Sequence, residues 1–208
     1  MVLGVFPILG LVPPRSVHHR SPTVLLLVDL INHFEFPDAP ALLKESLAIV
    51  DNIVGLKHRA RSANVPVLYV NDNFGQWRSN AKELLRYCVR KEAVGREFVK
   101  AIAPDQEDYF VLKPMHSGFY QTPLDALLRY FGAKSIVMAG IATNSCIVCT
   151  AHDAKMRDIE ITVASDCCAA RSQQEHTQAL DHLTATTGAR VVKAASIRFT
   201  KTRKPRGT

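Results

Sequence analysis

Residues 135–156 are the segment that most constrains how this chain of 208 residues can fold. They read SIVMAGIATNSCIVCTAHDAKM and begin with a short apolar run over residues 136–139. Such a run, closed by Gly140, is too short for a helix and predicts a buried strand. Thr143-Asn144-Ser145 then supplies side chains that cap helices, ahead of a helical pattern. The segment therefore predicts a strand, a tight turn and a helix, which together form a unit of α/β folds.

This arrangement places Cys146 in the first turn of the helix, just beyond the carboxyl end of the strand. Open α/β sheets build their functional sites at that edge. Unpaired backbone N–H groups and the positive end of the helix dipole favour the thiolate, which is the nucleophilic form. We therefore expect Cys146 to be a nucleophile. Most cysteines in folded proteins are small buried hydrophobic residues, and we assign that role to the others: Cys88, Cys149, Cys167 and Cys168.

Strand and helix patterns alternate along the rest of the chain. Six apolar runs are typical of strands. They are residues 23–30, 67–70, 109–112, 136–139, 159–164 and 190–192. Helical spacing occupies the segments between them: 41–62, 81–89, 94–102, 124–131 and 172–184. The alternation predicts a three-layer α/β/α fold with a doubly wound, mostly parallel six-stranded sheet.

The length of the chain suits one folded domain with short extensions, which we place at residues 21–193. Residues 1–20 are apolar at their start but lack a preceding charge and contain three prolines, so we interpret them as an N-terminal arm and not as a signal peptide. Residues 194–208 are basic and are expected to be a disordered tail. No apolar run is long enough to span a bilayer, so no membrane partner is expected.

The net charge of +7 comes almost entirely from the C-terminal end. Residues 193–208 hold six basic side chains and no acidic one, which leaves the rest of the chain near neutral. Because no nucleic-acid recognition pattern accompanies these residues, we do not expect a nucleic-acid partner. Five cysteines, an odd number, do not suggest a disulfide framework, and they predict a reducing cytoplasm.

Three of the expected strands end in residues that suit nucleophilic catalysis. Asp29 follows the first strand, Lys113 ends the third, and the turn that leads to Cys146 follows the fourth. In a parallel sheet these residues share one edge. A lysine cation beside the thiol would lower its pKa, and a carboxylate can accept or return a proton. We expect Asp29, Lys113 and Cys146 to form a catalytic triad.

The motifs LLLVDLINHF, FVLKPMHSGFY and VMAGIATNSCIVCTAHDA resemble those of the isochorismatase-like cysteine hydrolases, which include nicotinamidases and N-carbamoylsarcosine amidase. The likeness extends over residues 22–192 with the same order and spacing. It implies an α/β hydrolase with the triad named above. It also implies a cis peptide between Ile141 and Ala142, and an oxyanion hole made by the amides of Ala142 and Cys146.

The resemblance implies acyl transfer without a cofactor. Cys146 attacks the carbonyl of an amide or ureido group, Asp29 protonates the leaving amine, and water releases the thioester. Nicotinamidases carry a metal site with an Asp-x-His pattern after the second strand, where this chain reads Asp72-Asn73-Phe74. We therefore predict no metal and doubt nicotinamide as the substrate. Because isochorismatase itself cleaves a vinyl ether, the bond type stays open among amide, ureido and vinyl ether.

We expect a small substrate, planar or partly apolar, in a pocket formed by loops at the strand ends. His33 and His116 are as easily explained as ordinary loop residues, and neither is assigned to the site. The resemblance also implies a homo-oligomer, a dimer or a larger assembly. The residues expected to bind the substrate are Phe34, Asn73, Trp77, Arg78, Phe119 and Tyr120.

Two alternatives remain open. Cys146 and Cys149 form a CxxC pattern at a helix start, which is found in thiol–disulfide redox proteins, although Ile147-Val148 between them is unlike the usual redox pair. A catalytically idle scaffold of the same fold is the other alternative. A zinc site is disfavoured because the adjacent Cys167-Cys168 does not have ligand spacing.

Overall fold

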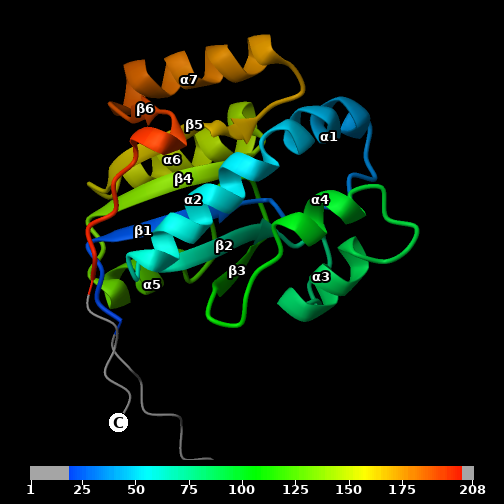
Figure 1. Cartoon of the computed structure of the whole chain (residues 1–208), viewed down its shortest axis with the longest axis horizontal. Coiled ribbons are helices and arrows are strands. Elements are labelled where there is room, and N and C mark those ends of the chain that lie inside the picture. Colours follow the sequence, from blue (N-terminus) through cyan, green and yellow to red (C-terminus); the bar gives the residue numbers. More distant parts are fainter. Residues whose placement is uncertain (1–18, 203–208) are drawn as a thin grey trace, which may run out of the picture.

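The six apolar runs form one parallel sheet in the computed structural model, which describes residues 19–202 (Figure 1). The sheet order is β3-β2-β1-β4-β5-β6, and every neighbouring pair is parallel. The predicted doubly wound α/β fold is confirmed. The strands are β1 (Thr23–Val28), β2 (Val67–Asp72), β3 (Tyr109–Lys113), β4 (Ser135–Ile141), β5 (Glu160–Ala169) and β6 (Arg190–Val192).

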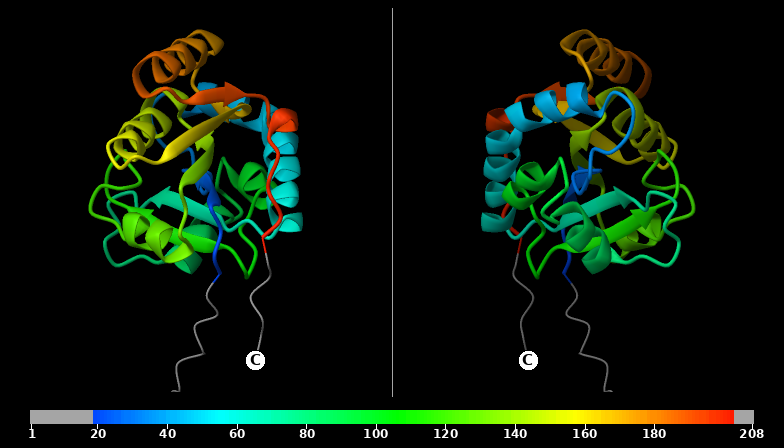
Figure 2. Two further views of the ribbon diagram at one scale, coloured as in Figure 1. Left: turned by 90° about the vertical axis from the view of Figure 1, so that its left-hand side faces the viewer. Right: turned by 90° about the vertical axis from the view of Figure 1, so that its right-hand side faces the viewer.

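Helices cover both faces of the sheet, and Figure 2 shows α2 along one face with α5 and α6 along the other. Residues of β1 alternate between two cores: Leu25 and Leu27 face one, while Leu26 and Val28 face the other. The first core is closed by α1 (Ala39–Ala48), α2 (Val50–Ser62), α3 (Ala81–Cys88) and α4 (Arg96–Ala101). The second is closed by α5 (Leu124–Phe131), α6 (Val148–Lys155) and α7 (Gln173–Thr187).

Two elements differ from the sequence-based expectation by more than a few residues at their ends. The single helix predicted over residues 41–62 is two helices separated at Ile49, whose N–H bonds to the oxygen of Ser46 and not to a residue four back. Ser46 Oγ also donates to the oxygen of Leu42 (2.7 Å), a contact that bends helices. Strand β5 continues to Ala169, because a bulge lets the strand pair with β4 again beyond the polar Ser165-Asp166 step.

Residues 194–202 do not form a free tail, so the predicted domain boundary after residue 193 is wrong for them. A short 3₁₀ helix, η2 (Ala194–Ser196), follows β6, and the Ile197 side chain is buried in the core. Thr202 N donates to the oxygen of Ala63 at the end of α2 (2.9 Å). Apolar side chains between the basic ones therefore anchor this segment. The predicted N-terminal arm (residues 1–20) and the last six residues lie outside the described part, apart from residues 19 and 20.

The strand order reverses between β1 and β4, and this switch point is where open α/β sheets bind ligands. Gly140 near the end of β4 has a φ of 135°, and a Cβ there would lie 2.0 Å from the oxygen of Val28 on β1. Only glycine lets the two strands approach so closely. Over residues 19–202, no helix is both long and apolar enough to cross a membrane.

Candidate functional site

Lys113, the last residue of β3, lies at the centre of a buried charge cluster at the carboxyl edge of the sheet. Its ammonium is fully buried, 2.8 Å from Asp29 Oδ2 and 3.5 Å from Asp72 Oδ2. The ammonium also donates to the oxygen of Met115 (3.1 Å). Because β2 and β3 are in register at Asp72 and Lys113, the two side chains project from adjacent strand ends. The lysine therefore faces two carboxylates and a carbonyl oxygen.

The Asp29 carboxylate is held by the backbone around it. Asp29 follows β1 with a φ of 51°, a left-handed conformation that aspartate tolerates better than most residues. Its Oδ1 accepts a hydrogen bond from Asp72 N (2.6 Å). The next turn is held by Asn71, whose side chain bonds both the N–H and the oxygen of Ile31. The left-handed turn thus directs the carboxylate toward Lys113.

Cys146 lies in a π-helical turn, η1 (Thr143–Ile147), that leads directly into α6. The peptide bond before this turn, between Ile141 and Ala142, is cis. The turn is closed by the oxygen of Ala142, which accepts from Ser145 N and Ile147 N. The sulfur is 3.5 Å from Lys113 Nζ and also bonds to Asp29. Strands β1, β3 and β4 thus bring Asp29, Lys113 and Cys146 together.

Electrostatics in the cluster favour a neutral thiol beside an ion pair. Burial raises the pKa of Cys146 to about 12, the Asp29 charge raises it further, and the Lys113 charge only partly opposes them. Burial also raises the pKa of Asp29, against the opposing charge of Lys113. Burial alone would lower the pKa of Lys113, but the charge of Asp29 raises it above its usual value. The expectation of a resting thiolate is therefore wrong, because desolvation and Asp29 outweigh the lysine.

A second group of polar atoms faces the sulfur. His116 Nδ1 lies 3.8 Å from Cys146 Sγ, and Ser145 Oγ lies 3.9 Å from the same sulfur. Ser145 Oγ and His116 Nδ1 are 3.3 Å apart, so the three atoms form a triangle. His116 is exposed, in contrast to the buried Lys113 and Asp29.

Three of the residues expected to bind substrate are buried. Phe34 packs edge-on against Phe98 in the first core (5.5 Å between ring centroids). Asn73 Oδ1 accepts from Gly75 N (2.9 Å) and so holds its own loop. Phe119 lies in the same apolar cluster as Cys146, with the Arg157 guanidinium over its ring. Of these three, only Phe119 shares packing with the cysteine.

The other three expected residues are exposed. Trp77 is 78% exposed and does not form a packed lid. Tyr120 borders a shallow groove with Arg157. Arg78 lines a cleft of about 730 Å³ beside the loop that follows β2, together with His33, Phe74 and Tyr87. The residues named as lining this cleft do not include Cys146, so the structure does not gather the predicted substrate residues around the sulfur.

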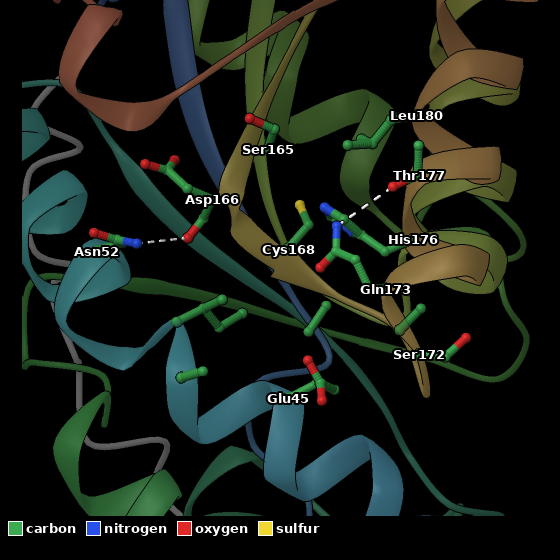
Figure 3. Close-up of a pocket in the computed structure, with 14 residues that line it drawn as sticks. Glu45, Asn52, Ser165, Asp166, Cys168, Ser172, Gln173, His176, Thr177 and Leu180 are labelled. Carbon is green, nitrogen blue, oxygen red and sulfur yellow. Dashed lines mark hydrogen bonds between the residues drawn. The ribbon is translucent and has the colours of Figure 1, made fainter.

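A second cleft, of about 430 Å³, lies between α1, α2, β5 and α7 (Figure 3). Its polar walls include Glu45, Asn52 and Asp166. Asn52 Nδ2 donates to the backbone oxygen of Asp166 (2.9 Å). His176 on α7 lines it and bonds through Nδ1 to Thr143 Oγ1 in the η1 turn (2.8 Å). This bond joins one wall of the cleft to the turn that carries Cys146.

All five cysteines are free thiols. Redox CxxC pairs depend on a lowered thiol pKa, and the raised pKa of Cys146 runs against that alternative. Across the described part of the chain, no three His, Cys, Asp or Glu side chains are grouped so as to hold a metal ion.

Sequence reasoning left two residues of this cluster unassigned. Asp72 is the last residue of β2, and Asp29 directly follows β1. Carboxylates at the ends of two neighbouring strands would have indicated that Asp72 also belongs to the cluster. His116 lies three residues after Lys113, but nothing in the sequence indicates that the loop turns its ring toward Cys146.

A doubly wound sheet with a buried Cys-Lys-Asp cluster at its carboxyl edge defines an α/β protein whose candidate site lies where open sheets bind ligands. The comparisons agree, because the model of the isochorismatase domain matches residues 23–196. The chain therefore belongs to the isochorismatase family and is a hydrolase of that family.

Relatives and solved structures carry the same family name or an amidase name. An uncharacterized isochorismatase family protein of Bacillus subtilis, YaaI, is 38% identical over 77% of this chain and 88% of its own length. A probable inactive nicotinamidase of Arabidopsis thaliana is 32% identical over 74% of this chain and 84% of its length. The crystal structure of N-carbamoylsarcosine amidase from Thermoplasma acidophilum superposes with a TM-score of 0.66 at 27% identity, covering 86% of this chain and 99% of that one.

Proposed function

We propose that the protein hydrolyses a C–N bond, of an amide or ureido group, in a small molecule, with Cys146 as nucleophile and a thioester as intermediate. The observation that carries the proposal is the position of the Lys113 ammonium, 2.8 Å from Asp29 and 3.5 Å from Cys146 Sγ. Structural lysines are rarely buried beside a free thiol and a carboxylate, whereas a nucleophile and its base require such contacts.

In the first half of the reaction, the Cys146 thiol gives its proton to Asp29 while the sulfur attacks the substrate carbonyl. The raised pKa of Asp29 makes it a better proton acceptor than an ordinary aspartate. The Lys113 cation stabilises the negative charge that develops on sulfur. Asp29 then passes the proton to the leaving nitrogen, the C–N bond breaks, and the acyl group remains on Cys146.

The amides of Ala142 and Cys146 are proposed to hold the oxyanion. The position of these amides supports the assignment, because Ala142 directly precedes the helical turn and Cys146 is among its first four residues, whose backbone N–H groups lack partners within a helix. Water then hydrolyses the thioester and regenerates the thiol.

The substrate class rests on the site and on one relative. The N-carbamoylsarcosine amidase that is similar to this chain carries a ureido-type bond in the name of its substrate. We propose a small amide or N-carbamoyl compound, with Phe119, which shares the apolar cluster of Cys146, at the pocket wall. Phe34 is left as a core residue.

We also propose a cytoplasmic homo-oligomer. Five free cysteines suit a reducing compartment. Large apolar side chains exposed near the strand-end loops, among them Trp77 and Met115, suit an interface between subunits.

The test is ammonia release from a panel of small amides and N-carbamoyl compounds, with Cys149→Ala as the matched control for Cys146→Ala. We expect the Cys146 variant to lose on the order of 10⁴-fold in kcat/KM or more, while the Cys149 variant keeps the wild-type rate. A thiol–disulfide protein would release no ammonia in any variant, and its reduction of a disulfide would be lost when either cysteine is replaced. A scaffold of this fold, as the name of the Arabidopsis relative suggests for that protein, would show no turnover in any variant.

A further inference from the structure

The turn that carries Cys146 is held by a buried contact with a helix that follows it in the sequence. Thr143, the first residue of η1, is fully buried, and its Oγ1 lies 2.8 Å from Nδ1 of His176 on α7. A second contact between the same elements, from Asn144 Nδ2 to Glu175 Oε2 (3.2 Å), is exposed, so water competes for both groups. The buried contact is therefore the stronger link between α7 and the turn.

The imidazole of His176 is itself fixed on several sides. It lines the cleft of Figure 3 with only 9% of its surface exposed, and it also bonds the backbone of Ser165 on β5. The start of α7 is capped by Ser172, whose Oγ accepts from Glu175 N (3.2 Å). Burial lowers the pKa of His176, which favours the neutral ring. A neutral imidazole and the hydroxyl of Thr143 can pair in either tautomer, because a hydroxyl both donates and accepts.

Thr143 lies between the two residues whose amides are proposed to hold the oxyanion. Ala142 directly precedes it, and Cys146 follows in the same turn. Within the turn, the oxygen of Ala142 accepts from Ser145 N (3.1 Å) and Ile147 N (3.3 Å), so a shift of Thr143 would move the turn as a unit. Stabilisation of an oxyanion depends on donors that are fixed before the reaction. A satisfied, buried polar contact at Thr143 supplies such a constraint.

We propose that His176 is a positioning residue for attack on the substrate carbonyl, an inference that rests on the proposed function. Its contact with Thr143 holds the amides of Ala142 and Cys146 where they receive the negative charge of the carbonyl oxygen. His176 touches neither the substrate nor the sulfur and transfers no proton. It acts only through the turn, which it joins to α7 and β5.

The test compares two reactions of the same sulfur. Acetylation of Cys146 by p-nitrophenyl acetate passes through an oxyanion, whereas alkylation by iodoacetamide displaces iodide and forms none. Intact mass and peptide mapping follow both. In Thr143→Val and in His176→Leu we expect the maximal rate of acetylation to fall about 10- to 100-fold, while the ester concentration for half that rate and the rate of alkylation change little. The double variant should be no slower than the slower single one, because both changes remove the same contact.

Conservative variants and a matched control separate this role from a general loss of packing. Thr143→Ser and His176→Asn keep a polar partner at the contact and should retain most of the acetylation rate. The control is Thr187→Val, which removes another buried hydroxyl of α7, one that bonds the oxygen of Leu183 and the N–H of Ala189 at the far end of the helix. It should lower stability without slowing acetylation.

Four results would overturn the role of His176 and leave the proposed function intact. They are unchanged acetylation in Thr143→Val, an equal slowing of acetylation and alkylation, a loss in Thr143→Ser as large as that in Thr143→Val, and a comparable loss in the Thr187 control. If His176→Leu does not fold, Thr143→Val carries the same test, because valine has nearly the shape of threonine. A wild-type protein in which Cys146 is not acetylated would overturn the proposed function itself.

Discussion

Two buried lysines lie near opposite ends of strand β3, and their pKa values shift in opposite directions. Asp108 precedes the strand and faces Lys57 of α2, whereas Lys113 ends the strand and faces Asp29. Both ammonium groups are almost completely buried. Burial lowers the pKa of Lys57 to about 8, while the pKa of Lys113 is raised above its usual value. Burial therefore favours the neutral form of Lys57, whereas Lys113 keeps its positive charge.

The partners explain the difference. Lys57 Nζ is 3.9 Å from Asp108, whose carboxylate is already bonded to Arg61, and it donates mainly to neutral groups, Tyr69 OH (2.9 Å) and the oxygen of Ala103. The Arg61 charge further lowers the pKa of Lys57. Lys57 therefore joins α2 to the loop between α4 and β3 through its hydrogen bond to Ala103.

Lys113 meets two carboxylates and a thiol at close range, and its charge is retained. A buried cation can act on a nucleophile only where its charge is stabilised in this way. The difference between the lysines is thus one of carboxylate distance and of competition from a second cation, and not of burial.

Replacing Lys113 should produce the larger loss. Lys113→Met leaves Asp29 buried without its cation, which typically costs about 3–5 kcal/mol of unfolding free energy, and it removes hydrolysis. Without the lysine, the pKa of Asp29 rises further above its unfolded value. The folded state then holds the proton over a wider pH range, so the deficit should shrink as the pH falls from 7 toward 5. Urea unfolding at both pH values measures it, and a deficit independent of pH would contradict a charged Asp29.

Removing the carboxylate should separate thiol ionisation from catalysis. Asp29→Asn takes away a charge that raises the pKa of Cys146, so the thiolate should form at lower pH, and iodoacetamide should alkylate Cys146 on the order of tenfold faster at neutral pH. Hydrolysis should nevertheless be lost, because Asp29 no longer carries the proton.

Asp108→Asn is the matched control, since it removes a carboxylate beside the other lysine. It should leave alkylation of Cys146 unchanged. If Asp29→Asn slows alkylation, the aspartate is helping to deprotonate the thiol even at rest, and the assignment of a neutral resting thiol fails.

The sheet and its edge could be predicted from local pattern. Uninterrupted apolar runs ending in Asp29, Lys113 and the Gly140 turn indicate the strands and the edge at which the site lies, whereas the order of the strands in the sheet comes from the structure. The split at Ile49 and the extension of β5 past Asp166 could not. The split accompanies a local side-chain hydrogen bond from Ser46 to Leu42, which an apolar pattern does not reveal, and the extension depends on a bulge in the pairing of β5 with β4.

Ionisation could not be predicted from the sequence either. A lysine near a cysteine suggests a thiolate, but the sign of the shift depends on how deeply the sulfur is buried and how close Asp29 lies. The substrate residues were selected by composition of the strand-end loops, and composition does not distinguish Phe34, which packs inward on Phe98, from Trp77, which points into solvent.

The smallest expected effect is that of Lys57→Met. Asp108 keeps Arg61 and the Tyr69 hydroxyl keeps the oxygen of Ile102, so at pH 7 the loss should stay near 1 kcal/mol, about that of one hydrogen bond. Hydrolysis should be unchanged. A loss as large as that of Lys113→Met would mean that Lys57 has a stabilised charge, and the comparison between the two lysines would fail.

The change of this stability difference with pH tests the state of Lys57 more sharply than its size at pH 7. The pKa of Lys57 is lowered to about 8 in the folded protein from a usual value of 10.5. Between these values the unfolded chain binds more protons, so the wild-type protein should gain stability with rising pH relative to Lys57→Met, by at most about 1.4 kcal/mol per pH unit. Urea unfolding of both proteins at pH 7.5, 8.5 and 9.5, values chosen to be roughly within this window, measures the difference, with the exposed Lys44→Met as control. A constant difference would mean that Lys57 keeps its proton in the fold, and that burial without a close carboxylate is not enough to discharge a lysine here.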